Sequence, residues 1–252
     1  MRLRRRATTF SLAVATLPFA PSASHASPVA DAPACLTGEG TVLPLIERPA
    51  AQGAGPLVVL LTGDGGWANA DQQVAVALAA RGTSVVGLNM RAYLATRRTP
   101  AETARDVACV AEHYLAAWNR TRLVLLGYSR GADIAPFVVA RWPATLRERL
   151  DMIALVSLSP SANFQFHLID IIRDVKRADD VPVAPEVAQL RGLPVICVYG
   201  ADDKDTGCTQ VDTTIAKPFV RRGGHRLTDG FDAIAALLAP ALAPAPAADV
   251  KR

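Results

Sequence analysis

Histidine is scarce in this 252-residue chain, and the spacings typical of metal or phosphate sites are absent. Only four histidines occur, and those that follow residue 26 are His113, His167 and His225. They are far apart, and the sequence contains neither H-x-x-x-H nor C-x-x-C. Zinc ligands usually come at such close spacings, so we expect no metal site. The glycine spacings of Rossmann and P-loop sites are also missing, and no cofactor is predicted.

The amino terminus has the pattern of a cleaved export signal. Four arginines among the first six residues precede an apolar stretch over Ala7–Ala20, and Ser24–Ala26 is a small-x-small cleavage site. The apolar stretch is shorter than the roughly 20 residues that span a bilayer. We therefore predict a signal peptide over residues 1–26, a periplasmic location and no transmembrane segment.

An excess of basic charge is lacking once this signal is set aside. The chain holds 27 Lys and Arg and 23 Asp and Glu, and residues 1–26 account for four Arg and no acidic residue. The remainder has 23 groups of each sign and no net charge. Nucleic-acid binding requires a basic face, so no nucleic-acid partner is expected.

Continuous apolar runs alternate with helical patterns along the rest of the chain. Buried strands are expected over Pro56–Leu61, Ser84–Leu88, Arg122–Gly127, Met152–Leu158 and Pro194–Tyr199, with a short last strand near Val220. Helices are expected over Asn69–Arg81, Thr99–Asn119, Ala132–Arg141 and Thr228–Leu238, the second of which starts with a capping box of Thr99 and Glu102. This alternation predicts an α/β fold with a mostly parallel central sheet and helices on both faces.

One large domain accounts for most of the chain. We expect an amino-terminal extension over residues 27–55 with an edge strand over Thr41–Ile46, the α/β domain over residues 56–240, and a disordered Ala/Pro tail over residues 241–252. Between Pro160 and Pro194 the alternation lapses. This segment is either a cap over the active site or an irregular crossover.

The segment Gly127–Gly131 has the sequence G-x-S-x-G and follows a predicted strand and precedes a predicted helix. That setting is typical of the nucleophile elbow of α/β-hydrolases, a strained turn that raises a serine hydroxyl above the sheet edge. Ser129 is therefore the candidate nucleophile.

A serine hydroxyl needs a base, and histidine has a suitable pKa. His225 follows Gly223-Gly224 and lies between the last predicted strand and the last helix. In α/β-hydrolases the order along the chain is serine, acid, histidine. The acid is expected after the strand that ends near Tyr199, where we favour Asp203, with Asp202 and Asp205 as alternatives.

The oxyanion of the reaction needs two backbone N–H donors. We expect one from Arg130, directly after the nucleophile, and the second from Asp64 in the turn Gly63–Trp67. The carboxylates of Asp64 and Asp133 are also candidate partners for a cationic substrate group, and the Arg130 side chain for a phosphate. Alternatively, Asp64 caps the following helix and Asp133 pairs with a helix dipole.

Four cysteines occur, and an even number in an exported chain permits disulfides. We predict a bridge between Cys197 and Cys208, which flank the loop that carries Asp203. Cys109 lies in a strongly helical stretch, and the sequence leaves open whether it is a disulfide partner or a small buried apolar residue. No partner is assigned to Cys35.

The chain resembles the VirJ/AcvB family of bacterial virulence proteins from about Leu57 to Leu238. The matching segments are Gly63–Trp67, Gly127–Asp133 with Pro136, Cys197–Gly200, Cys208 and Gly223–His225. Relatives often carry a second histidine where this chain has Arg226, which leaves His225 as the available base.

The resemblance implies a periplasmic α/β-hydrolase. Longer AcvB-type relatives resemble hydrolases of lysyl-phosphatidylglycerol, and VirJ-type relatives are linked to type IV secretion. We therefore expect a serine hydrolase that cleaves the aminoacyl ester of such a lipid at the membrane surface. The alternatives are a secretion accessory that acts by binding secretion-system proteins, and a general carboxylesterase.

Overall fold

The computed structural model describes residue 35 and residues 40–51, 55–171, 175–229 and 231–243. These residues belong to one compact unit, Ala32–Arg252. The predicted signal peptide therefore lies outside the described residues, as do residues 244–252 of the predicted tail.

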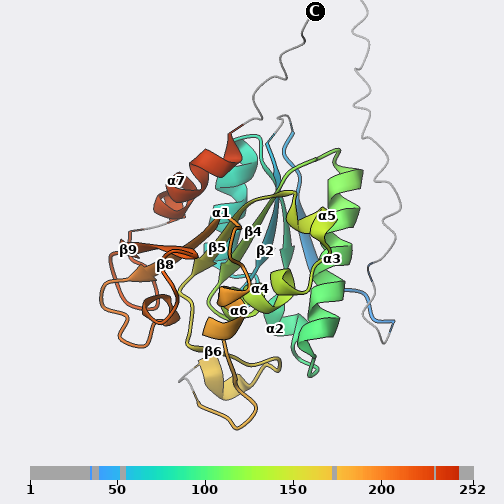
Figure 1. The fold of residues 1–252 in the computed structure, drawn as a ribbon. Helices are drawn as coiled ribbons and strands as arrows, with labels where there is room; N and C mark the ends of the chain where they lie inside the picture. Colours follow the sequence, from blue (N-terminus) through green and yellow to red (C-terminus); the bar gives the residue numbers. More distant parts are fainter. Residues whose placement is uncertain (1–34, 36–39, 52–54, 172–174, 230, 244–252) are drawn as a thin grey trace, which may run out of the picture. The chain divides into compact units, whose positions relative to one another are not determined.

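A seven-stranded sheet forms the centre of this unit (Figure 1). Its strands follow one another in the order β1-β3-β2-β4-β5-β8-β9. The strands are β1 (Leu45–Arg48), β2 (Leu57–Leu61), β3 (Ser84–Leu88), β4 (Leu123–Tyr128), β5 (Leu150–Val156), β8 (Val195–Gly200) and β9 (Ala216–Arg221). At one edge, β1 pairs antiparallel with β3, and every other neighbouring pair is parallel. The loops after the parallel strands thus gather at one end of the sheet, where ligands bind in open α/β sheets.

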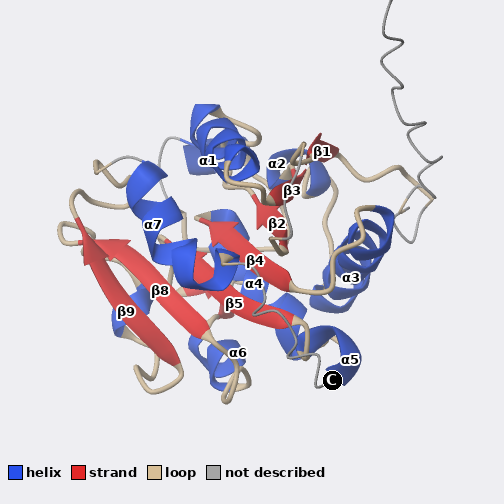
Figure 2. Cartoon of the chain, turned by 90° about the horizontal axis from the view of Figure 1, so that it is seen from above, coloured by secondary structure: helices blue, strands red, loops and turns tan. Residues whose placement is uncertain are grey.

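Helices cover both faces of the sheet, as Figure 2 shows from above. They are α1 (Asn69–Ala80), α2 (Met90–Tyr93), α3 (Pro100–Ala117), α4 (Arg130–Ala140), α5 (Ala144–Arg147), α6 (Ala184–Ala188) and α7 (Phe231–Leu242). Alternate residues of β2 enter two separate cores: Leu57 and Val59 pack with α3, α4 and α6, and Val58 and Leu60 with α1 and α7. This alternation explains why the inner strands are continuous apolar runs.

Several boundaries differ from the predicted ones. The edge strand is β1, four residues later than Thr41, and β5 ends at Val156 rather than Leu158. The last helix, α7, starts at Phe231 and continues through Pro240 to Leu242, past the predicted end at Leu238. The Arg122 guanidinium donates to the carbonyls of Ala241 and Ala243 and thereby satisfies groups that a helix end leaves open.

The irregular segment between Pro160 and Pro194 connects the parallel neighbours β5 and β8. It contains β6 (Ser161–Ala162) and β7 (Val181–Pro182), which pair antiparallel, the 3₁₀-helix η1 (Leu168–Ile171), and α6. Because α6 packs on α4, at least this part of the segment is a crossover that covers one face of the sheet.

Two disulfides join the described cysteines. Cys197, in β8, is bonded to Cys208, in the 3₁₀-helix η2 (Gly207–Thr209), as predicted. Cys109 is bonded to Cys35, a pairing that the sequence leaves open. This second bridge ties the amino-terminal extension to α3, and its 74-residue separation leaves no local signal of the pairing. Within the described residues, no helix is long and apolar enough to cross a membrane.

Candidate active site

Ser129 lies on a tight turn between β4 and α4, with φ 51° and ψ −118°. A positive φ at a residue other than glycine is strained and persists only where the surroundings enforce it. The Ser129 N–H donates to the carbonyl of Val156 at 2.9 Å, which anchors the turn to β5. At Gly131, any Cβ would collide with the backbone carbonyl of Leu61, so the glycine lets α4 approach β2. The predicted elbow geometry is therefore present.

His225 is brought to this turn by the loop after β9. Its Nε2 lies 2.9 Å from the Ser129 Oγ, a hydrogen-bond distance, although 96 residues separate the two. The loop passes close to the end of β8, where a Cβ on Gly200 would meet the carbonyls of Gly223 and Gly224. Glycine at position 200 therefore permits the approach that places the imidazole over the serine.

Asp203 is the acidic residue of its loop that contacts His225. Its Oδ2 lies 3.4 Å from His225 Nδ1, and its side chain is only 7% exposed. This contact has the length of an ion pair, and the alignment does not make a hydrogen bond. The backbone N–H of Asp205 donates to the other carboxylate oxygen at 3.3 Å. The alternatives Asp202 and Asp205 are exposed residues of the same loop.

Asp64 and Arg130 face each other across the turn after β2. The guanidinium donates from Nε to Oδ1 at 3.1 Å and from Nη2 to Oδ2 at 3.0 Å, a bidentate arrangement. Both side chains are largely buried, 9% exposed for Arg130 and 19% for Asp64. Contacts to a substrate ammonium and phosphate were one interpretation of these side chains, and in the structure each side chain is engaged by the other.

Asp133 is enclosed in the protein, one helical turn after Ser129. It is 3% exposed, and its Oδ1 accepts a hydrogen bond from the backbone N–H of Ser159 at 2.7 Å. Burial raises the pKa of this carboxyl to about 7, although the nearby Arg130 charge opposes the shift. Of the two interpretations left open for Asp133, a substrate contact and a structural role, this environment favours the structural role.

Ser157 joins the site, although the sequence does not single it out. Its hydroxyl donates to the backbone carbonyl of His225 at 2.7 Å, and its own φ is 57°. The predicted strand Met152–Leu158 included it as an ordinary strand residue. A serine that interrupts an apolar run at the carboxyl end of a strand is the one available signal.

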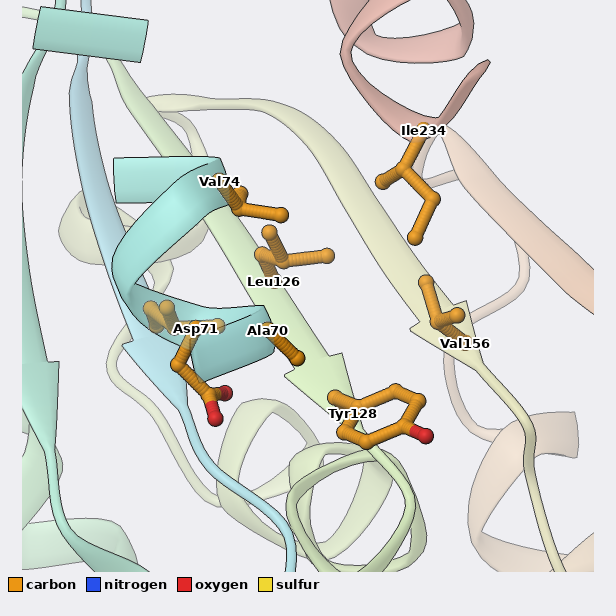
Figure 3. Close-up of a pocket in the computed structure, with 8 residues that line it drawn as sticks. Ala70, Asp71, Val74, Leu126, Tyr128, Val156 and Ile234 are labelled. Carbon is orange, nitrogen blue, oxygen red and sulfur yellow. The ribbon is translucent and has the colours of Figure 1, made fainter. Parts of the chain in front are cut away.

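A small apolar cavity of about 20 Å³ lies beneath the elbow, on the face covered by α1 and α7 (Figure 3). Its lining is Leu60, Ala70, Asp71, Val74, Leu126, Tyr128, Val156 and Ile234. The Asp71 carboxylate points away from the apolar side chains, and burial raises its pKa to about 6. A space of this size holds about one water molecule, so the cavity is too small for a substrate.

Comparisons with known proteins identify the family and the fold. The profile of the family described as bacterial virulence protein (VirJ) matches residues 56–245. No curated protein sequence matches the chain. In the described part of the chain, no group of three or more His, Cys, Asp or Glu residues is placed to hold a metal ion.

Solved structures of hydrolases share the fold. A cold-adapted esterase from an Arctic intertidal metagenomic library has a TM-score of 0.57 and 20% identity, with 82% of this chain and 92% of that chain covered. Est1E from Butyrivibrio proteoclasticus, with bound ferulic acid, has a TM-score of 0.56 and 13% identity, covering 79% and 94%. The thioesterase domain from the curacin biosynthetic pathway has a TM-score of 0.53 and 18% identity, covering 79% and 100%. At these identities the likeness shows the fold alone, which is that of the α/β-hydrolases.

Proposed function

Because this chain belongs to the bacterial virulence protein family VirJ, we propose that it is an exported serine hydrolase that cleaves carboxylic esters. The observation that carries the proposal is the 2.9 Å contact between Ser129 Oγ and His225 Nε2 at a strained elbow. A binding protein has no need of a serine held in this conformation beside an imidazole.

In the proposed acylation step, Nε2 of His225 accepts the Ser129 proton as Oγ attacks the ester carbonyl. The resulting imidazolium is stabilised by the carboxylate of Asp203. His225 then protonates the leaving alcohol, and the acyl group remains on Ser129. A water molecule, deprotonated by the same imidazole, releases the acid and restores the serine. The 3.4 Å contact to Asp203 has to shorten during this cycle, as apo geometries of such groups commonly do.

We assign the oxyanion hole to the backbone N–H groups of Arg130 and Asp64. The first amides of a helix have no acceptor within the helix, and they point toward an anion at its amino terminus. Arg130 is the first residue of α4. Gly63 supports the placement of Asp64, because a Cβ at position 63 would lie only 3.2 Å from the Ser129 Cβ. The turn after β2 therefore passes directly beside the nucleophile.

For the substrate we propose the aminoacyl ester of lysyl-phosphatidylglycerol or a similar aminoacylated lipid at the membrane surface. The support is the resemblance to AcvB-type proteins. The side chains of Asp64 and Asp133 add nothing to it, since one is paired with Arg130 and the other is buried. A periplasmic location is supported by the two disulfides, which persist in oxidising compartments.

A fluorophosphonate probe tests the hydrolase proposal. The wild-type protein without residues 1–26 should be labelled, and Ser129→Ala should not be. Ser84→Ala is a matched control, because Ser84 is a buried serine at the amino end of β3, away from the elbow. Equal labelling of wild type and Ser129→Ala would exclude the assigned nucleophile. No labelling and no hydrolysis by the wild type would favour a secretion accessory that acts by protein binding.

A substrate panel then tests the proposed lipid. Release of lysine from lysyl-phosphatidylglycerol vesicles is compared with hydrolysis of soluble neutral esters. We expect a kcat/KM for the lysyl lipid at least about tenfold higher, equivalent to about 1.4 kcal/mol of transition-state binding. A higher kcat/KM for the neutral esters would instead identify a general carboxylesterase.

A further inference from the structure

Three consecutive residues after β5, Ser157–Ser159, contact each of the three elements that carry the proposed triad. The first contact is to the loop after β9 that carries His225, which we call the histidine loop. The Ser157 hydroxyl donates to the backbone carbonyl of His225 at 2.7 Å. Ser157 is fully buried, so this hydrogen bond is shielded from competing water.

The second contact is to the loop after β8 that carries Asp203, which we call the acid loop. The Leu158 carbonyl accepts the backbone N–H of Gly207 at 2.7 Å and lies 3.4 Å from the Thr206 hydroxyl. Gly207 precedes Cys208, which is bonded to Cys197 in β8. The carboxyl end of the acid loop is therefore held twice, by the disulfide to β8 and by the carbonyl of Leu158.

The third contact is to the helix that begins directly after the nucleophile. The Ser159 N–H donates to the Asp133 carboxylate at 2.7 Å. This buried carboxylate, which the hydrolytic mechanism does not use, thus attaches α4 to the same three residues. The segment Ser157–Ser159 is bonded to the nucleophile helix, the acid loop and the histidine loop in succession.

Ser157 itself is strained, and its surroundings enforce the strain. Its φ of 57° is in the left-handed region, which residues other than glycine rarely adopt. The Ser157 N–H donates to the Val198 carbonyl at 2.7 Å, which fixes it against β8. The left-handed backbone conformation of Ser157 directly precedes Leu158 and Ser159, the residues that contact the acid loop and α4.

The histidine loop is closed by bonds among its own residues, including the Thr228 N–H to the Arg222 carbonyl, and the Ser157 hydroxyl ties it to the residue after β5. The His225 side chain is 44% exposed, and two glycines precede it. Glycines leave the backbone many accessible conformations, and an exposed ring gains little from burial. The hydroxyl of Ser157 holds the His225 backbone from the buried side.

We infer that Ser157 is a positioning residue, whose hydroxyl holds His225 in line with Ser129, and that Ser157–Ser159 is the segment that aligns the three catalytic elements. The inference rests on the proposed function. In this role Ser157 contacts neither the substrate nor the reacting atoms. It acts through the His225 backbone, so its loss should lower kcat while leaving KM within about twofold.

Two variants separate the hydroxyl from the backbone strain. Ser157→Ala removes the hydroxyl and keeps the strain of a positive φ, whereas Ser157→Gly removes both. We expect kcat to fall about 10- to 100-fold in both variants, because small misplacements of catalytic groups reduce rates by such factors. Ser157→Gly should be the more stable of the two. The control Ser84→Ala removes a buried hydroxyl at the opposite end of the sheet and should keep the wild-type kcat.

A readout that does not need activity completes the test. The imidazole Hε1 resonance of His225 is assigned by its loss in His225→Asn and followed by NMR. It should shift or broaden in both Ser157 variants and stay unchanged in Ser84→Ala, while the His113 resonance stays unchanged in all. An unaltered His225 resonance with a kcat within twofold of wild type would overturn the inference. If the wild type hydrolyses no ester, the hydrolase proposal fails, and the resonance alone still decides whether Ser157 positions His225.

Discussion

The pairing of Asp64 with Arg130 makes a prediction that separates two roles for the same carboxylate. If Asp64 binds a cationic acyl group, Asp64→Asn should slow hydrolysis of lysyl esters and spare neutral ones. The geometry indicates another role, since the two residues whose backbone amides we assign to the oxyanion hole are joined by their side chains. In that case the pair fixes the spacing of the two donors, and Asp64→Asn should slow both substrates alike.

The expected magnitudes follow from the burial of the pair. A hydrogen bond to a charged group contributes about 1.5–3 kcal/mol to stability. The exposed fractions of 9% and 19% lie between those of a surface pair and a fully buried one. Asparagine keeps one acceptor oxygen, so we expect a loss of about 2 kcal/mol. For a domain of this size that corresponds to a decrease in Tm of about 4–8 °C.

The effect on activity should appear in kcat, because the oxyanion forms only in the transition state. Removal of one oxyanion donor costs about 10²–10³ in kcat. Asp64→Asn displaces the donors without removing either, so we expect a decrease of about tenfold. The assay measures kcat and KM for a neutral soluble ester and for a lysyl ester of the same alcohol.

The Arg141–Glu186 pair provides a matched control. It is also bidentate, with contacts of 2.8 and 3.1 Å, and joins the carboxyl end of α4 to α6, away from the elbow. Glu186→Gln should lower stability modestly and leave kcat unchanged. A selective loss for the lysyl ester in Asp64→Asn would refute the positioning role and restore Asp64 as a substrate contact. Unchanged kcat for both esters would show that the pair is structural only.

Three further predictions concern the nucleophile, the acid loop and the buried carboxyl. Ser129→Ala should reduce ester hydrolysis by at least about 10³-fold with an unchanged circular dichroism spectrum, and near-wild-type activity would contradict the elbow assignment. Replacement of Cys197 and Cys208 by serine should reduce stability by about 3 kcal/mol in urea denaturation, and free thiols at both positions in mass spectrometry of the native protein would remove the basis of this expectation. The pKa of Asp133 is about 7 in the folded protein, compared with the ordinary value of 3.8 that applies to the unfolded chain. The folded protein therefore binds this proton more tightly than the unfolded chain, and its stability falls as the pH rises from about 4 to 7. Asp133→Asn removes this penalty, and its Tm relative to wild type should therefore increase between pH 5 and 8, whereas a constant difference would place the titration elsewhere.

Features that depend on neighbouring residues were predictable from the sequence. The buried strands and the Thr99–Glu102 capping box follow from local periodicity and side-chain chemistry, and both are present in the structure. The elbow at Ser129 is recognisable because a strand, a turn and a helix follow within a few residues. The Cys197–Cys208 bridge spans only 11 residues around one loop, which made the pairing predictable.

The contacts that organise the candidate site depend on how distant segments pack. Asp64 and Arg130 are 66 residues apart, Ser157 and His225 are 68 apart, and Cys35 and Cys109 are 74 apart. No local sequence pattern predicts these contacts, because each partner by itself is a residue type that is common in loops or helices. The crossover connections of the parallel sheet place them together, and burial then decides their chemistry. The sequence alone pointed to Ser129, Asp203 and His225 because the elbow motif and the order of such residues along the chain are local signals. Only the tertiary structure decided that Asp64 faces Arg130 and that Ser157 donates to the His225 carbonyl.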